Sequence, residues 1–216
     1  MRILTRRLVL LLGLFTLAGC AVQQQGAMVD RKLSEADPAK MGVVVGSFGI
    51  KMTGREGGSQ VLLLRRLESR GEDVTVLFQA NMDDFPPDVR DSRSQATIFA
   101  LKLPEGWSEI YNFRQTRPGV YGSSTTFSSR ADFSFLFQIE AGKASYVGEY
   151  LSVPTNARNI FGTVQVPSPY FEVGDQRARD LAFAQAKLPE FDYANARDFI
   201  PDVVALKHPL FSKATP

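Results

Sequence analysis

Residues 132–140 read DFSFLFQIE and place an apolar side chain at every second position, with Leu136 as the one apolar residue between them. The alternation places four apolar side chains on one face, namely Phe133, Phe135, Phe137 and Ile139. A period of two over this length predicts a β-strand with one buried face. A second strand pattern, ASYVGEYLSV, follows after a short break, so residues 137–154 predict a β-hairpin. Gly142 is suited to positive φ in its turn, and Lys143 would be a solvated tip.

Strand patterns recur along most of the chain, about eight in all. The others cover residues 42–52, 59–67, 72–80, 96–104, 106–114 and 160–166. Turns join most of them, with a Pro-rich loop over 83–93 and a Gly/Ser/Thr loop over 115–131. Strands and helices do not alternate regularly, so we expect a mainly β protein, an antiparallel β-sandwich, with an up-and-down barrel as the alternative.

The C-terminal part, about 174–216, changes character. A helix is expected from near Asp175 until Pro189 ends it. Its apolar face would contain Ala178, Leu181, Ala182, Gln185 and Leu188. Beyond it, the aromatic and leucine content predicts an irregular but ordered tail that packs back on the domain.

The first twenty residues begin with a basic segment, continue with an apolar run and end in small residues. MRILTRR precedes LVLLLGLFTLAG, an apolar run too short to span a bilayer comfortably, and the run ends in Leu17-Ala18-Gly19-Cys20. This pattern resembles bacterial lipoprotein precursors. The resemblance implies that residues 1–19 are a signal peptide and that Cys20 becomes an acylated first residue. Arg6 and Arg7 also fit a twin-arginine signal, but the strongly apolar run favours the general secretory route.

Removal of residues 1–19 would change the charge and the cysteine chemistry. Loss of Arg2, Arg6 and Arg7 lowers the basic count from 25 to 22 against 23 acids, a net charge of −1. No basic domain remains to bind nucleic acid. Cys20 is the single cysteine and would carry lipid, so disulfides, thiol catalysis and Cys-ligated zinc are excluded.

Residues 20–41 are polar and predict a lipidated tether that connects the membrane to one domain over residues 42–216. Ala21 follows the cysteine, where an Asp would indicate inner-membrane retention under enterobacterial sorting rules. By that resemblance, the outer membrane is favoured over the inner membrane.

Several side chains are candidates for catalytic or metal-binding groups. Gly142-Lys143 lacks the earlier Gly and the following Ser or Thr of a phosphate-binding loop. His208 has no nucleophile-elbow string to accompany it. Asp83 and Asp84 lie in a Pro-rich turn, which favours solvated capping residues over calcium ligands or half of a carboxylate pair. Glu140 and Glu149 flank the expected hairpin and could face each other across it.

The remaining candidate surface is the segment NFRQTRPGVYGS. It contains Phe113, Arg114, Arg117 and Tyr121, and Arg and Tyr are common among interface hot spots. The alternative is a mobile loop without a partner. If it binds, the partner would be an envelope protein or a glycan.

Residues 98–152 carry a second resemblance. Leu103, Pro104 and Gly106, then Ala141-Gly142-Lys143 with Tyr146 and Gly148, match strings found in small bacterial lipoproteins. Those lipoproteins have a prealbumin-like or carboxypeptidase-regulatory-like sandwich. Ser108 stands where that group usually has Tyr. The resemblance implies an Ig/prealbumin-like fold and no catalytic residues.

The sequence therefore predicts a membrane-anchored envelope lipoprotein that binds or supports another component without catalysis, and that needs no cofactor or metal. The alternatives are an accessory subunit of an envelope secretion or transport complex and, less favoured, a cell-wall or lipid hydrolase.

Overall fold

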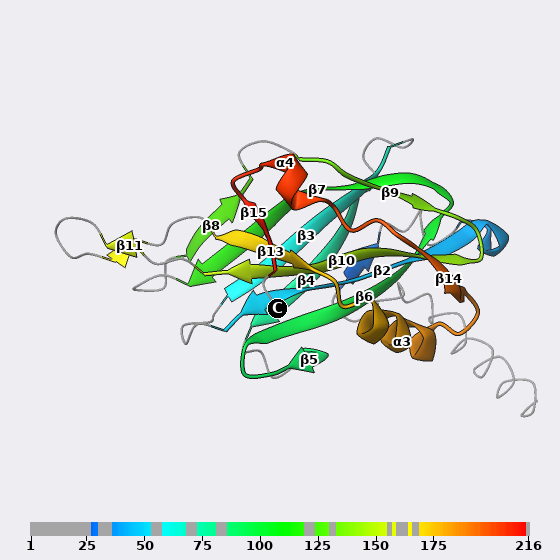
Figure 1. Cartoon of the computed structure of the whole chain (residues 1–216), viewed down its shortest axis with the longest axis horizontal. Coiled ribbons are helices and arrows are strands. Elements are labelled where there is room, and N and C mark those ends of the chain that lie inside the picture. The colour runs from blue at the N-terminus through cyan, green and yellow to red at the C-terminus, as the bar shows by residue number, and fades with distance from the viewer. Residues whose placement is uncertain are drawn as a thin grey trace, which may run out of the picture.

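Two β-sheets packed face to face account for most of the described chain (Figure 1). The computed structural model describes residues 27–29, 36–52, 58–67, 73–80, 86–118, 124–129, 133–154, 157–158, 164–165 and 169–214. The protein is thus mainly β and fits the predicted β-sandwich.

The first sheet, sheet A, is antiparallel throughout and follows the order β1-β4-β3-β7-β8. Strand β9 pairs with the first half of the long β7, and β8 pairs with its second half. The strands of sheet A are β1 (Ala27–Val29), β3 (Gly58–Arg66), β4 (Asp73–Ala80), β7 (Gly106–Pro118), β8 (Ser124–Ser128) and β9 (Phe135–Ile139).

The second sheet, sheet B, follows the order β15-β13-β10-β2-β6-β5, with β14 also paired to β10. Its strands are β2 (Met41–Lys51), β5 (Val89–Arg90), β6 (Ser94–Pro104), β10 (Lys143–Val153), β13 (Tyr170–Gly174), β14 (Asp192–Asp198) and β15 (Phe211–Lys213). Three of its pairs are parallel: β2 with β10, β10 with β14, and β13 with β15. The prediction of an antiparallel sandwich is therefore wrong for this sheet.

The expected hairpin over 137–154 is also wrong, although its turn is present. Gly142 has φ 73°, and the Lys143 N–H donates to the Glu140 carbonyl at 3.1 Å. However, β9 pairs with β7 in sheet A, whereas β10 pairs with β2 in sheet B. Alternation shows which face of a strand is buried but not which strand lies beside it. Both strands bury their apolar faces in the same interior from opposite sheets.

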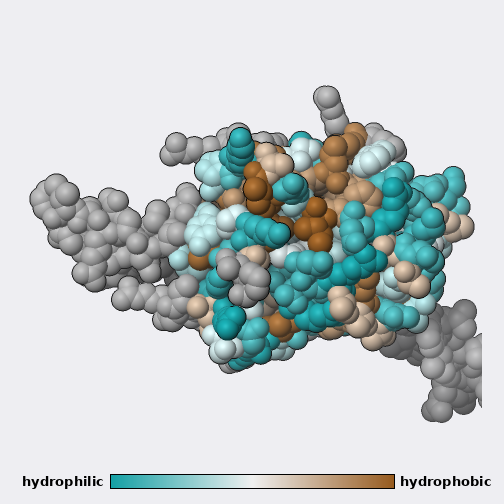
Figure 2. Space-filling view, viewed as in Figure 1, coloured by the Kyte–Doolittle hydropathy of each residue, from teal (hydrophilic) through white to brown (hydrophobic). Residues whose placement is uncertain are grey.

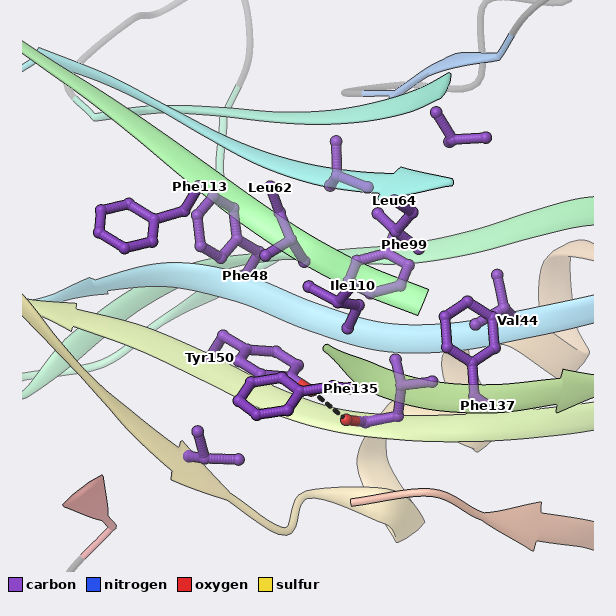
Figure 3. Packing of buried hydrophobic residues seen from close by; sticks show 14 of the residues in the cluster. Val44, Phe48, Leu62, Leu64, Phe99, Ile110, Phe113, Phe135, Phe137 and Tyr150 are labelled. Atoms are coloured by element: carbon purple, nitrogen blue, oxygen red, sulfur yellow. Dashed lines mark hydrogen bonds between the residues drawn. The ribbon is translucent and has the colours of Figure 1, made fainter. Parts of the chain in front are cut away.

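The interior between the sheets contains the main hydrophobic core. Figure 3 shows side chains from both sheets converging there, among them Phe48, Leu62, Phe135 and Phe137. The four apolar side chains of 133–139 are all buried, which confirms the face predicted by their alternation. Tyr150 lies in the same core, and its hydroxyl donates to the Val147 carbonyl at 2.8 Å.

A second, smaller core lies on the other face of sheet B, under helix α3 (Arg177–Lys187). It consists of Val43, Val45, Ala144, Tyr146, Leu181, Ala184, Tyr193 and Ala196. Strands β2 and β10 are consequently buried on both faces, which explains the unbroken apolar run Val43-Val44-Val45 in a mixed sheet.

Helix α3 confirms the predicted helix, but the buried face is different. Leu181 is buried as expected, whereas Ala178, Ala182 and Gln185 are exposed, and Asp180 and Ala184 are buried instead. Among the described residues, no helix is long and apolar enough to cross a membrane.

Several segments expected to be irregular contain regular structure. The expected tether contributes β1, a 3-10 helix η1 (Pro38–Lys40) and the first residue of β2. The Gly/Ser/Thr loop contains the end of β7 and all of β8, and the Pro-rich loop contains β5. The tail is ordered as predicted, but it forms β14, helix α4 (Val203–Leu206) and β15. A separate small sheet pairs β11 (Ala157–Arg158) with β12 (Val164–Gln165).

Candidate functional site

Three of the four residues of the predicted partner loop, Phe113, Arg114 and Arg117, lie on strand β7 rather than in a loop. Phe113 is 2% exposed and lies in the core (Figure 3). The centroid of its ring is 4.3 Å from that of Phe171, and the two rings meet edge to face. Arg114 is exposed on β7, and Arg117 lies near the end of the same strand. Tyr121 lies outside the described residues, as do Cys20, Asp83 and Asp84. Phe113 therefore stabilises the sandwich and is not available to a partner.

His208 and Glu140, two further candidates from the sequence, both make local contacts. The ring of His208 packs 5.4 Å from that of Phe211, and its Nδ1 accepts the Leu210 N–H at 3.3 Å. Glu140 accepts a hydrogen bond from Lys143 at 2.7 Å and another from Arg197. Glu140 and Glu149 do not face each other, since Glu149 pairs in register with Gly174.

Arg179 of α3 is the centre of a polar network on the outer side of sheet B. Its Nε donates to Asp180 Oδ1 at 2.8 Å, and its Nη2 donates to Glu149 Oε1 at 2.8 Å. The same Nη2 donates to the Ser47 hydroxyl at 2.9 Å. One guanidinium thus connects α3 with β10 and β2.

Asp180 is the other junction of this network and is completely buried. Its Oδ2 accepts hydrogen bonds from Ser47 Oγ at 2.8 Å and from Tyr146 Oη at 3.3 Å. Tyr146 Oη in turn accepts the Gln176 N–H at 2.9 Å, just before α3 begins. Hydrogen bonds from several donors are the usual means by which a protein offsets the cost of burying a carboxylate.

The charges of the network do not balance. Two carboxylates, Glu149 and Asp180, share the single guanidinium of Arg179. Burial raises the pKa of both carboxyl groups, against the lowering effect of Arg179. Burial alone would lower the pKa of Arg179, but its hydrogen bonds to the two carboxylates raise it. With both acids ionised, the network carries one negative charge in excess.

A cleft of about 740 Å³ lies beside this network, between the end of β13 and the segment that leads into α4. Glu149 forms part of its wall although the residue is only 5% exposed. Its register partner on β13 is Gly174, which has no side chain, and its register partner on β2 is Ser47. Glu149 Oε2 accepts no hydrogen bond from any residue that the structure describes.

The walls of the cleft differ in chemistry. Ile200, Pro201, Val203 and Val204 contribute an apolar side, and Figure 2 shows apolar side chains gathered on this face near α4. Asp175, Asp202 and Lys213 contribute the charged groups around Glu149. An apolar wall facing a few polar groups is the usual composition of a small-molecule site.

Sequence reasoning missed most of this site. Ser47 stands inside an apolar strand, and Asp180 stands at a helix position where the period of 3.6 requires a buried side chain. A polar residue at a core position is the signal that could have identified both. Arg179, adjacent to Asp180, carried no separate signal.

No protein-family model matches the chain, and no curated protein or solved structure matches it either. Among the described residues, no group of three or more His, Cys, Asp or Glu side chains is placed to hold a metal ion.

Proposed function

We propose that this protein is a lipid-anchored binding module of the bacterial envelope, and that its ligand occupies the cleft beside Glu149. The observation that carries the proposal is Glu149, which is 5% exposed in the wall of the cleft and whose Oε2 accepts no hydrogen bond from any described residue. Removing a carboxylate from water without pairing both oxygens costs free energy, which a ligand could recover.

The module binds rather than catalyses. The two hydroxyl groups of the network are committed to it, because Ser47 and Tyr146 both donate to Asp180. A hydrolase would need one of them poised beside a general base and open to substrate. The prealbumin-like relationship remains part of the proposal; the two-sheet architecture supports it, and the parallel pairs of sheet B distinguish this chain from a fully antiparallel sandwich.

The anchoring part of the proposal rests on Leu17-Ala18-Gly19-Cys20 and is tested at its thiol. A Cys20→Ala variant is expected to lose incorporation of radiolabelled palmitate and to leave the membrane fraction, because several acyl chains hold a protein far more firmly than one. The measurement is metabolic labelling followed by membrane fractionation. Cys20→Ala protein that still incorporates palmitate would contradict lipidation at this residue.

The binding part is tested by photocrosslinking in living cells. A benzoylphenylalanine at Val204, which borders the cleft and is 64% exposed, is expected to give a ligand adduct. The matched control places the same group at Trp107 of sheet A, which is 44% exposed and lies outside the cleft. Intact-mass spectrometry of the purified, irradiated proteins shows the added mass. Equal adducts at both positions, or none at Val204, would contradict a ligand in this cleft.

A further inference from the structure

We propose that the ligand carries a protonated amine or guanidinium joined to an apolar group, with the cation bound at Glu149 Oε2. The inference rests on the proposed function and specifies the chemistry of the same cleft. It follows from three properties of the site: its charge, its apolar wall and the space above Gly174.

The charge of the site favours a cation. Arg179 already serves both Glu149 and Asp180, so the buried network keeps one uncompensated negative charge when both are ionised. Asp175 and Asp202 add two carboxylates to the cleft, and Lys213 adds one positive charge. A cation would supply the missing countercharge where burial weakens solvent screening.

The helix terminus at the cleft does not reverse this preference. Helix α3 begins beside it, and a helix N-terminus by itself attracts anions. Two of the amide groups there already have acceptors: Asp175 Oδ1 accepts the Arg177 N–H at 2.9 Å, and Tyr146 Oη accepts the Gln176 N–H. These two N–H groups are therefore not open to an anion, whereas Glu149 Oε2 accepts no hydrogen bond from any described residue.

The apolar wall indicates what the cation is attached to. Ile200 and Val204 face the same cleft as Glu149, and the side chain of Val204 is largely exposed to solvent. An apolar group lying against them would be removed from water while the cation stays at the carboxylate. A bare ion such as ammonium or a metal would leave this wall unused.

Gly174 provides the space that the cation needs. A Cβ built at this position would lie 3.6 Å from Glu149 Oε2 and 3.2 Å from the Cβ of Ala214. The φ of Gly174 is outside the left-handed region, so alanine is compatible with the backbone. Gly174→Ala therefore obstructs the carboxylate without changing any charge.

The test compares three probes of the same shape: 3-methylbutylamine, 3-methylbutanol and 3-methylbutanoate. Each is titrated into the full-length, isotope-labelled protein in detergent micelles, and the amide signals of Glu149 and Gly174 are followed by NMR. The amine is expected to shift both signals saturably, and to bind at least tenfold more tightly than the alcohol or the carboxylate.

Two variants and one control locate the contact. Glu149→Gln is expected to weaken amine binding at least tenfold, as for loss of a hydrogen bond to a charged group. Gly174→Ala, which retains the carboxylate and its ion pair, should weaken it similarly even if Glu149→Gln folds poorly. The control Lys102→Gln removes a positive charge from a residue outside the cleft and should leave amine binding unchanged.

The outcomes separate this inference from the proposed function. If the alcohol or the carboxylate binds as well as the amine and Gly174→Ala abolishes binding, the cleft is a binding site and the cationic preference is wrong. If the amine binds equally to wild type, Glu149→Gln and Gly174→Ala, the assignment to Glu149 is wrong. If none of the probes shifts these signals, the inference is overturned, and the crosslink at Val204 decides independently whether the cleft holds a different ligand.

Discussion

Replacing Arg179 with methionine is expected to lower the free energy of unfolding by about 3 kcal/mol, the low end of the range for breaking a buried ion pair. Methionine retains the length and apolar stem of the side chain but leaves Glu149 and Asp180 buried without their guanidinium. Urea unfolding monitored by circular dichroism measures the change. Because the side chain of Arg179 is 30% exposed, the larger losses seen for fully buried pairs are not expected.

Arg177→Met is the matched control for this prediction. Arg177 lies on the same helix and forms an ion pair with Asp198, but the pair is on the surface, where such pairs contribute about 0–1 kcal/mol. The double variant Arg179→Met, Asp180→Asn should regain part of the stability, since it removes one unpaired charge. Equal losses for Arg179→Met and Arg177→Met would contradict the central role of Arg179.

Replacing Phe137 with alanine is expected to lower the free energy of unfolding by about 3–5 kcal/mol, the range for deleting a buried aromatic side chain. Phe137 is 1% exposed and lies in the core between the sheets. The neighbouring Leu136 points to the other face of β9 and is 50% exposed, so Leu136→Ala should cost less than about 1 kcal/mol.

The two variants lie at adjacent positions of β9, so their comparison tests which face of the strand is directed into the core. Denaturant midpoints from the same unfolding experiment give both values. A larger loss for Leu136→Ala than for Phe137→Ala would mean that the strand is turned by one residue from the orientation described here.

The sequence predicted where strands form and which of their faces are buried better than it predicted which strands pair with each other. The alternation over 133–139 identified four buried side chains, because the period of a strand is a local property of the chain. The pairing of β9 with β7 and of β10 with β2 depends on contacts between distant residues, and no local pattern reports them. For the same reason, parallel pairs appeared where turns suggested antiparallel ones.

The candidate site was predicted least well. The arginines Arg114 and Arg117 predict an exposed binding segment that includes Phe113, yet the position of Phe113 on β7 directs it into the core. For Glu149, the sequence suggests only Glu140 as a possible partner. Its contact with Arg179 joins residues 30 positions apart through a helix packed on the sheet, so it becomes visible only when the fold is known.

The parallel pairing of β2 with β10 has a consequence for how the chain acquires its structure. Val43 lies beside Ala144 and Ile50 beside Ser152, so the central strand of sheet B is incomplete until the chain has been made well beyond its midpoint. Contacts this distant along the chain form slowly, because a long loop must close first. A nascent chain therefore cannot complete this sheet early, and the sandwich closes only after most of the chain has been synthesised.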